Sequence, residues 1–316
     1  MGGELCRQIG PQAIPLDIDT LDLTDGKAVQ DMLPPLRPEA IINCAAYTQV
    51  DKAEKEPDLA YAVNAAAVEN IVRVCKEIGC PLVQISTDYV FSGKDESRVQ
   101  GSGFRVQDLG FRVQEAKEDV HPSSFILHPS FNRPYLEDDP TTPQGVYART
   151  KLDGERAVAR YEKHIIVRTC GLYARPSDNR AHNFVKTMLR LGSTRSELSV
   201  VADQYCTPSY VPHVARAVLF LAGFHLPSPA PWGIYHVTNT GATNWHDFAE
   251  EIFRLAGMNV SVKAITTAEY GAPAERPSYS VLDTTAYQSL GGPPMPDWKT
   301  ALEEYICEWR RLQIAN

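Results

Sequence analysis

Short apolar runs and longer stretches with apolar residues on one helical face alternate along most of this chain. The short runs predict buried parallel strands at residues 13–16, 40–46, 82–85, 164–170 and 234–238, and another strand ending at 200–204. The longer stretches predict helices at residues 1–9, 58–78, 144–155, 183–191, 243–255 and 298–312, and one that begins after a cap at Thr24 or Asp25. Strands that alternate with helices predict an α/β fold, a doubly wound, Rossmann-like parallel sheet.

The beginning of the chain departs from this pattern. A sheet of this type normally opens with a strand and a glycine-rich turn that holds a dinucleotide pyrophosphate at a helix N-terminus. Here a predicted helix comes first, and only Gly2 and Gly3 stand where the turn would enter it. We therefore expect the first, central strand to be missing and Met1 not to be the natural beginning. A flexible terminus is the alternative interpretation of the two glycines.

The pattern is also interrupted at residues 94–132, where Arg-Val-Gln and His-Pro-Ser recur. We interpret this segment as a low-complexity insertion without a catalytic role. Residues 1–170 are predicted to form a dinucleotide-binding domain that contains the insertion. Residues 171–316 carry polar loops and a helical cap, which indicates a smaller substrate-binding lobe with some segments returning to the core sheet.

Composition excludes several classes of protein. The chain has 316 residues, 43% of them hydrophobic and 22% charged, as in ordinary globular proteins. A net charge of −8 argues against nucleic acid as a partner and provides no basic patch for a membrane. No apolar run is long enough to span a bilayer, and no signal peptide begins at Met1. The seven cysteines form no Cys-x-x-Cys pair, which favours reduced thiols in the cytoplasm and no metal site.

Tyr147 and Lys151 are the first candidates for chemistry. They are four residues apart, so on a helix they share one face. A phenol has a pKa of about 10, and an ammonium beside it lowers that pKa toward the range useful for proton transfer. With 14 tyrosines in the chain, this spacing also arises by chance, so its meaning depends on the surroundings.

Ser86 and Thr87 provide those surroundings. They follow the predicted strand 82–85, and ligands of open α/β sheets bind outside the carboxyl ends of the strands. An isolated Ser-Thr pair is typical of a strand-end turn. A strand-end hydroxyl followed by a Tyr–Lys helix is instead the arrangement of short-chain dehydrogenase/reductases. Asp17, at the end of the predicted strand 13–16, fits the acid that binds the adenosine ribose, although a solvated turn is equally compatible.

Six stretches together carry a more specific resemblance, at residues 43–54, 86–91, 147–155, 183–189, 203–204 and 276–277. With them the chain resembles the dTDP-4-dehydrorhamnose reductase family, a branch of the extended short-chain dehydrogenase/reductases, over most of its length except the insertion. The resemblance implies reduction of the 4-keto group of dTDP-4-dehydro-6-deoxy-L-mannose to dTDP-L-rhamnose. It implies NADPH or NADH as cofactor, a nucleotide-sugar substrate, and a cytoplasmic monomer or homodimer.

The resemblance also implies roles for individual residues. Thr87 polarises the keto oxygen, Tyr147 donates the proton, and Lys151 lowers the pKa of Tyr147 and binds the nicotinamide ribose. The implied cofactor contacts are Gly2, Asp17, Asp22, Leu23, Ala45, Ala46 and Tyr47. The implied contacts to the nucleotide sugar are Asn183, Gln204 and Arg276, with a surface ion pair as the alternative for Arg276. Glu4 matches a glutamate that binds Mg²⁺ at a dimer interface in some members, and otherwise no metal is expected.

Two departures from the family pattern keep other functions open. The glycine-rich turn is incomplete, which suits a non-catalytic nucleotide-binding subunit, like the regulatory partner of methionine adenosyltransferase that shares this fold. Gly171 stands where the family often has a tryptophan near the sugar. A missing ring removes apolar contact area, so a reductase or epimerase acting on another nucleotide sugar is the second alternative.

Overall fold

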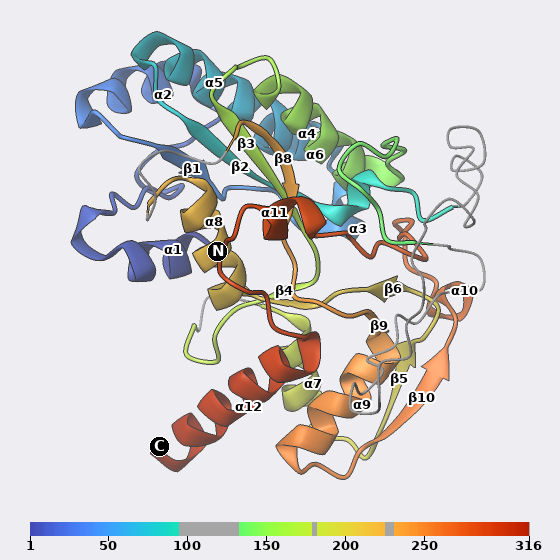
Figure 1. The fold of residues 1–316 in the computed structure, drawn as a ribbon. Coiled ribbons are helices and arrows are strands. Elements are labelled where there is room, and N and C mark those ends of the chain that lie inside the picture. The colour runs from blue at the N-terminus through green and yellow to red at the C-terminus, as the bar shows by residue number, and fades with distance from the viewer. Residues whose placement is uncertain (95–132, 179–181, 225–230, 316) are drawn as a thin grey trace, which may run out of the picture.

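A four-stranded parallel sheet forms the centre of the molecule in the computed structural model, which describes residues 1–94, 133–178, 182–224 and 231–315 (Figure 1). Its strands lie in the order β1-β2-β3-β8. Their bounds are Ile41–Asn43 for β1, Leu82–Thr87 for β2, His164–Thr169 for β3 and Gly233–His236 for β8. All neighbours in this sheet are parallel, which confirms the predicted α/β class and four of the predicted strands.

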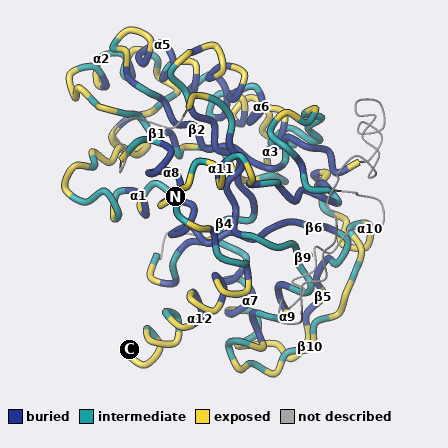
Figure 2. The backbone as a smooth tube through the Cα atoms, viewed as in Figure 1, coloured by how far each residue is buried: buried dark blue, intermediate teal, exposed yellow. Residues whose placement is uncertain are grey.

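Helices cover both faces of this sheet, as a doubly wound fold requires. Val83 and Val167 are buried against α1 (Gly2–Ile9) and α8 (Val211–Leu221). Leu82 and Ile166, one position away in each strand, are buried in a cluster with residues of α5 (Ala67–Ile78) and α6 (Gly145–Val158). Successive residues of a strand point to opposite faces, so a strand that is buried at every position, as β2 is, must be covered on both sides. Figure 2 shows β2 as a buried strand, and all six of its residues are buried.

The predicted strand at 13–16 is wrong. After the short 3-10 turn Gly10–Gln12, residues 13–16 are irregular, and Ile14 and Leu16 are 56% and 39% exposed. Within the described residues β1 pairs with β2 alone, so no strand lies along its other edge. An extended segment needs a neighbouring strand for its backbone hydrogen bonds, and residues 13–16 do not pair with any described strand.

The predicted helix 58–78 is present but not uniform. It consists of α4 (Pro57–Tyr61), a π-helical turn (Ala62–Ala66) and α5. Before it come α2 (Gly26–Met32), the 3-10 turn Pro34–Leu36 and α3 (Val50–Ala53). Asp25 caps α2, because its Oδ1 accepts from the backbone N–H groups of Lys27 at 2.9 Å and Ala28 at 3.0 Å. The predicted cap at Asp25 is therefore confirmed.

The last third of the chain has its own core. The helices α7 (Phe184–Gly192), α9 (Trp245–Ala256) and α12 (Trp298–Ala315) contribute to one apolar cluster with β5 (Glu197–Val201), which pairs with β10 (Ser261–Ile265). The remaining elements are short: β4 (Leu172–Tyr173), β6 (Tyr205–Cys206), β7 (Ser209–Tyr210), β9 (Thr243–Asn244), α10 (Thr267–Tyr270) and α11 (Thr285–Ser289). The division near residue 170 stays a prediction, and the predicted insertion lies outside the described residues apart from Lys94. Among the described helices, none combines the length and apolarity that crossing a bilayer requires.

Candidate active site

The carboxyl end of β2 and the first turns of α6 meet at one place. Thr87 ends β2, and its hydroxyl oxygen accepts from the backbone N–H of Tyr89 at 3.2 Å, which caps the 3-10 turn Asp88–Val90. At the start of α6, the backbone N–H of Val146 donates to Oε1 of Glu54 at 2.7 Å. This carboxylate lies at the positive end of the helix and supplies a cap that Gln144 does not provide. Glu54 thus fixes the first turn of α6, a role that the sequence did not reveal.

Thr87, Tyr147 and Lys151 come together at this junction. Thr87 lies close enough to Tyr147 to influence its pKa, and the Tyr147 ring meets the Tyr89 ring edge-on, with centroids 5.7 Å apart. The Lys151 ammonium is buried and donates to the backbone carbonyl of Ile85 at 2.7 Å. The predicted hydroxyl, phenol and amine therefore lie at the carboxyl end of one central strand.

The acidity of these groups differs from the expectation. Burial raises the pKa of Tyr147 to about 12, hydrogen bonding to Thr87 partly opposes this shift, and the carboxyl of Asp88 adds to it. Burial lowers the pKa of Lys151 to about 8, while Glu155 and Cys44 raise it. The expected lowering of the Tyr147 pKa by Lys151 is wrong for this structure. The loss of water around the phenol outweighs other effects, and the hydrogen bond of the amine goes to the strand carbonyl.

A buried polar network lies behind this junction. Arg168 on β3 pairs with Glu155 on α6, with 2.8 Å between Nη2 and Oε2, and the two side chains are 3% and 4% exposed. The hydroxyl of Ser86 also donates to Glu155. Arg168 further donates to the backbone carbonyl of Glu137 at 3.0 Å, and its Nη1 lies 3.5 Å from Nε2 of His236. Glu155 follows Lys151 by four residues on the same helical face, which is the one signal of this network in the sequence.

Four of the predicted cofactor residues lie around the carboxyl end of β1. Gly2 begins α1, and a Cβ there would lie 3.7 Å from the Cβ of Cys44, just after β1. The backbone N–H of Ala45 donates to the side chain of Asn43 at 3.0 Å. Ala46 and Tyr47 follow directly in the chain. The small residues Gly2, Ala45 and Ala46 leave backbone accessible to a ligand at the edge of the sheet where a dinucleotide binds in doubly wound folds.

The other three predicted cofactor residues lie in turns before α2. Asp17 bonds locally, since its Oδ1 accepts from the backbone N–H of Asp19 at 3.2 Å. Asp22 accepts from the hydroxyl of Thr24 at 2.7 Å, and its pKa is lowered by these bonds. Leu23 is partly buried against the core. Both aspartates thus have the geometry of the solvated turn that was the alternative for Asp17.

Asn64, in the π-helical turn, is a positioning residue that the sequence did not indicate. Its Oδ1 accepts from the backbone N–H of Tyr47 at 2.8 Å, and its Nδ2 donates to Thr150 Oγ1 on α6 at 3.1 Å. A Cβ at Gly154 of α6 would lie only 2.2 Å from the Asn64 carbonyl oxygen. A glycine inside this helix is therefore required by the close approach of the two backbones. Irregular helical turns of this kind are frequent at functional sites.

The three predicted substrate contacts are placed differently from one another. Asn183 caps α7, since its Oδ1 accepts from the backbone N–H of Lys186 at 3.0 Å, while its Nδ2 is buried without a partner among the described residues. Gln204 is buried and donates to Thr267 Oγ1 at 2.9 Å. Arg276 forms a two-pronged ion pair with Asp51, with N–O distances of 2.8 and 3.1 Å. The binding roles of these three residues stay predictions.

Gly171 has a positive φ of 54°. A Cβ at this position would lie 3.0 Å from the Cα of Pro208 and 3.4 Å from Cη2 of Trp245. The backbone of Pro208 cannot give way as the end of a flexible side chain can. Any larger residue at Gly171 would therefore be strained, and the indole of Trp245 lies beside the space that its side chain would take.

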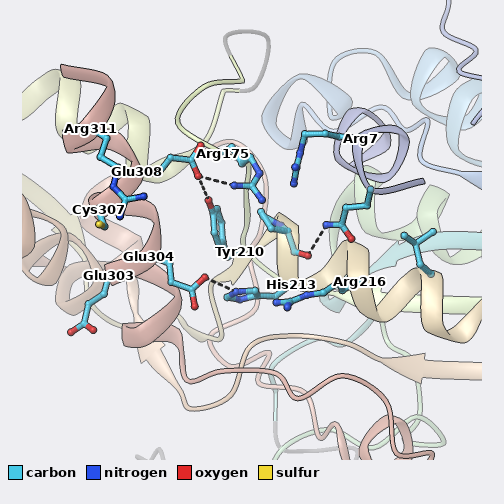
Figure 3. Close-up of a pocket in the computed structure, with 13 residues that line it drawn as sticks. Arg7, Arg175, Tyr210, His213, Arg216, Glu303, Glu304, Cys307, Glu308 and Arg311 are labelled. Atoms are coloured by element: carbon cyan, nitrogen blue, oxygen red, sulfur yellow. Dashed lines mark hydrogen bonds and ion pairs between the residues drawn. The ribbon is translucent and has the colours of Figure 1, made fainter. Parts of the chain in front are cut away.

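A hollow of about 1060 Å³ lies between α1, α8 and α12, and Tyr147 is not among the residues that line it (Figure 3). Beside it, Glu4 accepts from Arg7 Nε at 2.9 Å, from Arg175 Nε at 3.0 Å and from Gln8 Nε2 at 2.7 Å. Arg175 also donates to Glu308 of α12 at 2.8 Å. Magnesium needs carboxylate oxygens that face an open coordination site. At Glu4 the guanidinium groups of Arg7 and Arg175 occupy that site, and their positive charges would repel the metal ion. Glu4 therefore does not fit as a magnesium ligand.

Another group of potential metal ligands lies at the start of α9. Ligand atoms of His246, Asp247 and Glu250 are within 4.8 Å of one another. Both ring nitrogens of His246 are already engaged, Nδ1 with Asp247 at 2.9 Å and Nε2 with the carbonyl of Val262 at 3.1 Å. A metal requires a free nitrogen lone pair, so this histidine serves to tie α9 to β10.

Comparisons with known proteins agree on one group. The chain matches the family described as RmlD substrate binding domain over residues 1–109 and 117–311. It is 38% identical over 287 residues to a dTDP-4-dehydrorhamnose reductase of Streptomyces griseus, covering 90% of this chain and 81% of that protein. A solved dTDP-4-dehydrorhamnose reductase of Bacillus anthracis in complex with NADP is 36% identical, with a TM-score of 0.79 and coverage of 97% and 95%. One from Clostridium acetobutylicum is 38% identical, with a TM-score of 0.79 and coverage of 99% and 95%.

Proposed function

The chain belongs to the dTDP-4-dehydrorhamnose reductase family, and from this premise we propose that it reduces dTDP-4-dehydro-6-deoxy-L-mannose to dTDP-L-rhamnose with NADPH or NADH. The convergence of Thr87, Tyr147 and Lys151 at the carboxyl end of β2 carries this proposal. Ligands of doubly wound sheets bind at that edge. A phenol, a hydroxyl and an ammonium together can bind a ketone and deliver a proton to it.

Tyr147 acts as the proton donor. A pKa of about 12 keeps its hydroxyl protonated at neutral pH, which is the state that a donor needs. The reduced nicotinamide supplies the hydride to C4 when it is bound. As the carbonyl becomes an alcohol, the Tyr147 proton passes to the former keto oxygen and leaves a phenolate. Thr87 donates a second hydrogen bond to the same oxygen and so stabilises the charge that develops there.

We assign Lys151 to binding of the cofactor. Its ammonium has three N–H donors, and the one hydrogen bond that it forms within the described residues goes to the carbonyl of Ile85. The remaining donors suit the hydroxyls of a nicotinamide ribose. With a pKa of about 8 the amine is mostly charged at neutral pH, which strengthens its hydrogen bonds to those hydroxyls.

The remaining predicted contacts complete this proposal. We assign cofactor binding to Gly2, Asp17, Asp22, Leu23, Ala45, Ala46 and Tyr47. The orphaned Nδ2 of Asn183 supports a role in binding a phosphate or sugar oxygen, because a buried donor without a partner is costly. We assign Gln204 to binding the sugar nucleotide. We assign Arg276 to the diphosphate, because its guanidinium binds two oxygens of Asp51 at once and could bind two phosphate oxygens in the same way. A cytoplasmic monomer or homodimer that does not bind nucleic acid is part of the same proposal.

The test follows nicotinamide absorbance during incubation with dTDP-4-dehydro-6-deoxy-L-mannose. Tyr147→Phe removes the proton donor and is expected to lower kcat by about 10²-fold or more. Tyr61→Phe is the matched control, because Tyr61 is exposed on α4 and its hydroxyl has no role in the mechanism. Undiminished turnover in Tyr147→Phe would refute the assignment. Calorimetry with NADPH and NADH separates an inactive reductase from a subunit that does not bind the cofactor.

The surroundings of Gly171 favour a second candidate, a reductase of the same family acting on another dTDP-linked keto sugar. Even a Cβ at this position would lie 3.0 Å from the Cα of Pro208, so a ring there would require the backbone to shift. Comparing kcat/KM for several dTDP-linked 4-keto sugars decides between the two substrates, since removing apolar contact area changes binding by about 1–3 kcal/mol.

A further inference from the structure

Asp88 is a buried carboxyl directly behind the proposed catalytic hydroxyl. It follows Thr87 at the end of β2 and is 3% exposed. Thr87 Oγ1 lies 3.1 Å from its Oδ1. Its other oxygen, Oδ2, is buried and has no hydrogen-bond partner within the described part of the chain. A buried carboxylate normally has a cation or several donors on both oxygens, so this environment is unusual for a charged Asp88.

The groups facing Asp88 are all neutral in their ordinary states. They are Tyr89 in the following turn, Tyr147 on α6, the Cys170 thiol after β3 and the Ser280 hydroxyl. No lysine or arginine of the described residues forms an ion pair with it, and Lys151 donates to Ile85. Burial raises the pKa of Asp88, while Cys170, Ser280 and Thr87 oppose that shift. Geometry and acidity therefore both favour the protonated acid.

The protonation of Asp88 decides what Thr87 can do. A carboxylate can only accept, so it would take the single hydroxyl proton of Thr87. A carboxylic acid can donate its own proton to Thr87 Oγ1. That oxygen already accepts from the backbone N–H of Tyr89 at 3.2 Å. With both lone pairs occupied, Thr87 could no longer accept from Tyr147, and the protons of both hydroxyls would be free for the substrate.

We propose that Asp88 works as a neutral carboxylic acid that donates a hydrogen bond to Thr87 and thereby directs the Thr87 and Tyr147 hydroxyl protons toward the keto oxygen. Asp88 is a positioning residue in this scheme, because it acts through its contact with Thr87. The inference rests on the proposed function, since it requires Thr87 to act as a donor to a ketone.

Substitution distinguishes an acid from a carboxylate at this position. Asp88→Asn places a permanent N–H donor where the acid O–H stands, so we expect it to retain most of its kcat. Asp88→Ala removes the donor and is expected to lower kcat by about 10²-fold, comparable to the loss of one hydrogen-bond donor to a developing oxyanion. In the wild type, kcat is expected to fall as pH rises through the pKa of Asp88, and Asp88→Asn should abolish that fall. An Asp88→Asn protein that is folded but as slow as Asp88→Ala would overturn the proposal.

Infrared spectroscopy gives a readout that does not require activity. The difference spectrum between wild type and Asp88→Asn at neutral pH should contain the carbonyl stretch of a protonated carboxyl group. A carboxylate band alone would disprove the neutral acid, whatever the enzyme reduces. If the wild-type protein reduces no ketone while the acid band is present, the proposed function fails and the protonation state of Asp88 stands.

Discussion

The stability of the fold depends on both charges of the buried ion pair between Arg168 and Glu155 being present. Both are almost completely buried, and each is the charged partner of the other. Arg168→Met leaves the Glu155 carboxylate buried without a cation, so we expect the free energy of unfolding to fall by about 3–5 kcal/mol. Urea denaturation measures this change. Arg156→Met is the control, because its pair with Asp153 is 64% and 39% exposed and such pairs contribute about 1 kcal/mol or less.

The double variant Arg168→Met/Glu155→Leu completes this experiment. Removing both charges eliminates the unpaired carboxylate, so much of the lost stability should return. If the double variant is no more stable than Arg168→Met, the penalty does not come from the stranded charge. Loss of packing around the aliphatic part of Arg168 would then explain it.

At the residue scale, the sequence predicted the placement of side chains where that placement depends on local pattern. Tyr147 and Lys151 share a helical face through their spacing, and Thr87 follows from an apolar run that ends in hydroxyls. Glu54 escaped notice because its hydrogen bond joins positions 92 residues apart. The pKa of Tyr147 was also inaccessible, because it depends on how completely surrounding elements exclude water.

At the scale of elements, the packing of α6 against the π-helical turn leaves no space for one added methyl group. Gly154→Ala would place a Cβ 2.2 Å from the Asn64 carbonyl oxygen, so the helices must separate. We expect a loss of stability of about 1–3 kcal/mol, as for other overpacked sites. Gly3→Ala in α1 meets nothing within 4 Å and should instead be neutral or stabilising by up to about 1 kcal/mol. Thermal unfolding compares the two, and similar effects would contradict the close approach.

The prediction of helices and strands was limited because a hydrophobic pattern does not show whether a segment has a neighbouring strand to pair with. The strands 82–85 and 164–170 are present because they have neighbours within the sheet. The segment 13–16 has the same apolar pattern but no strand beside it, so it stays irregular. The π-helical turn within 58–78 was also invisible, because its hydrophobic periodicity hardly differs from that of an α-helix.

At the scale of the whole molecule, His236 makes stability depend on pH. Its Nδ1 lies 3.0 Å from the Tyr135 carbonyl oxygen, and its Nε2 faces Arg168. Burial and Arg168 lower the pKa of His236 to about 3. An unfolded histidine has a pKa of about 6.5, so below that pH the unfolded state binds a proton that the folded state rejects. Stability is therefore lost as pH falls from about 6.5 toward 3, by about 2 kcal/mol at pH 5.

Denaturation at pH 7.5 and pH 5 tests this dependence. His236→Asn keeps a donor for the carbonyl groups but does not titrate, so its stability should change less between the two pH values. Other histidines contribute equally to both proteins and cancel in the comparison. If wild type and His236→Asn lose the same stability, His236 is not the source.

The overall architecture could be predicted from the sequence more completely than the individual elements or contacts. Alternating strands and helices specify a parallel sheet covered on both faces, and no single contact decides that outcome. The arrangement of the second core, which joins α7, α9 and α12 to β5, depends on pairings between distant segments. Those pairings could not be read from periodicity alone.

The π-helical turn at Ala62–Ala66 has a consequence for how this protein can change through insertion and deletion. A π turn holds one more residue than a regular turn, and the side-chain bonds of Asn64 help offset its weaker geometry. Deleting a single residue there would let the backbone relax into ordinary helix while rotating Asn64 away from Tyr47 and Thr150. The shortened protein would gain regularity and lose the hydrogen bonds that align this segment with α6, so a one-residue deletion here would reach the proposed active site.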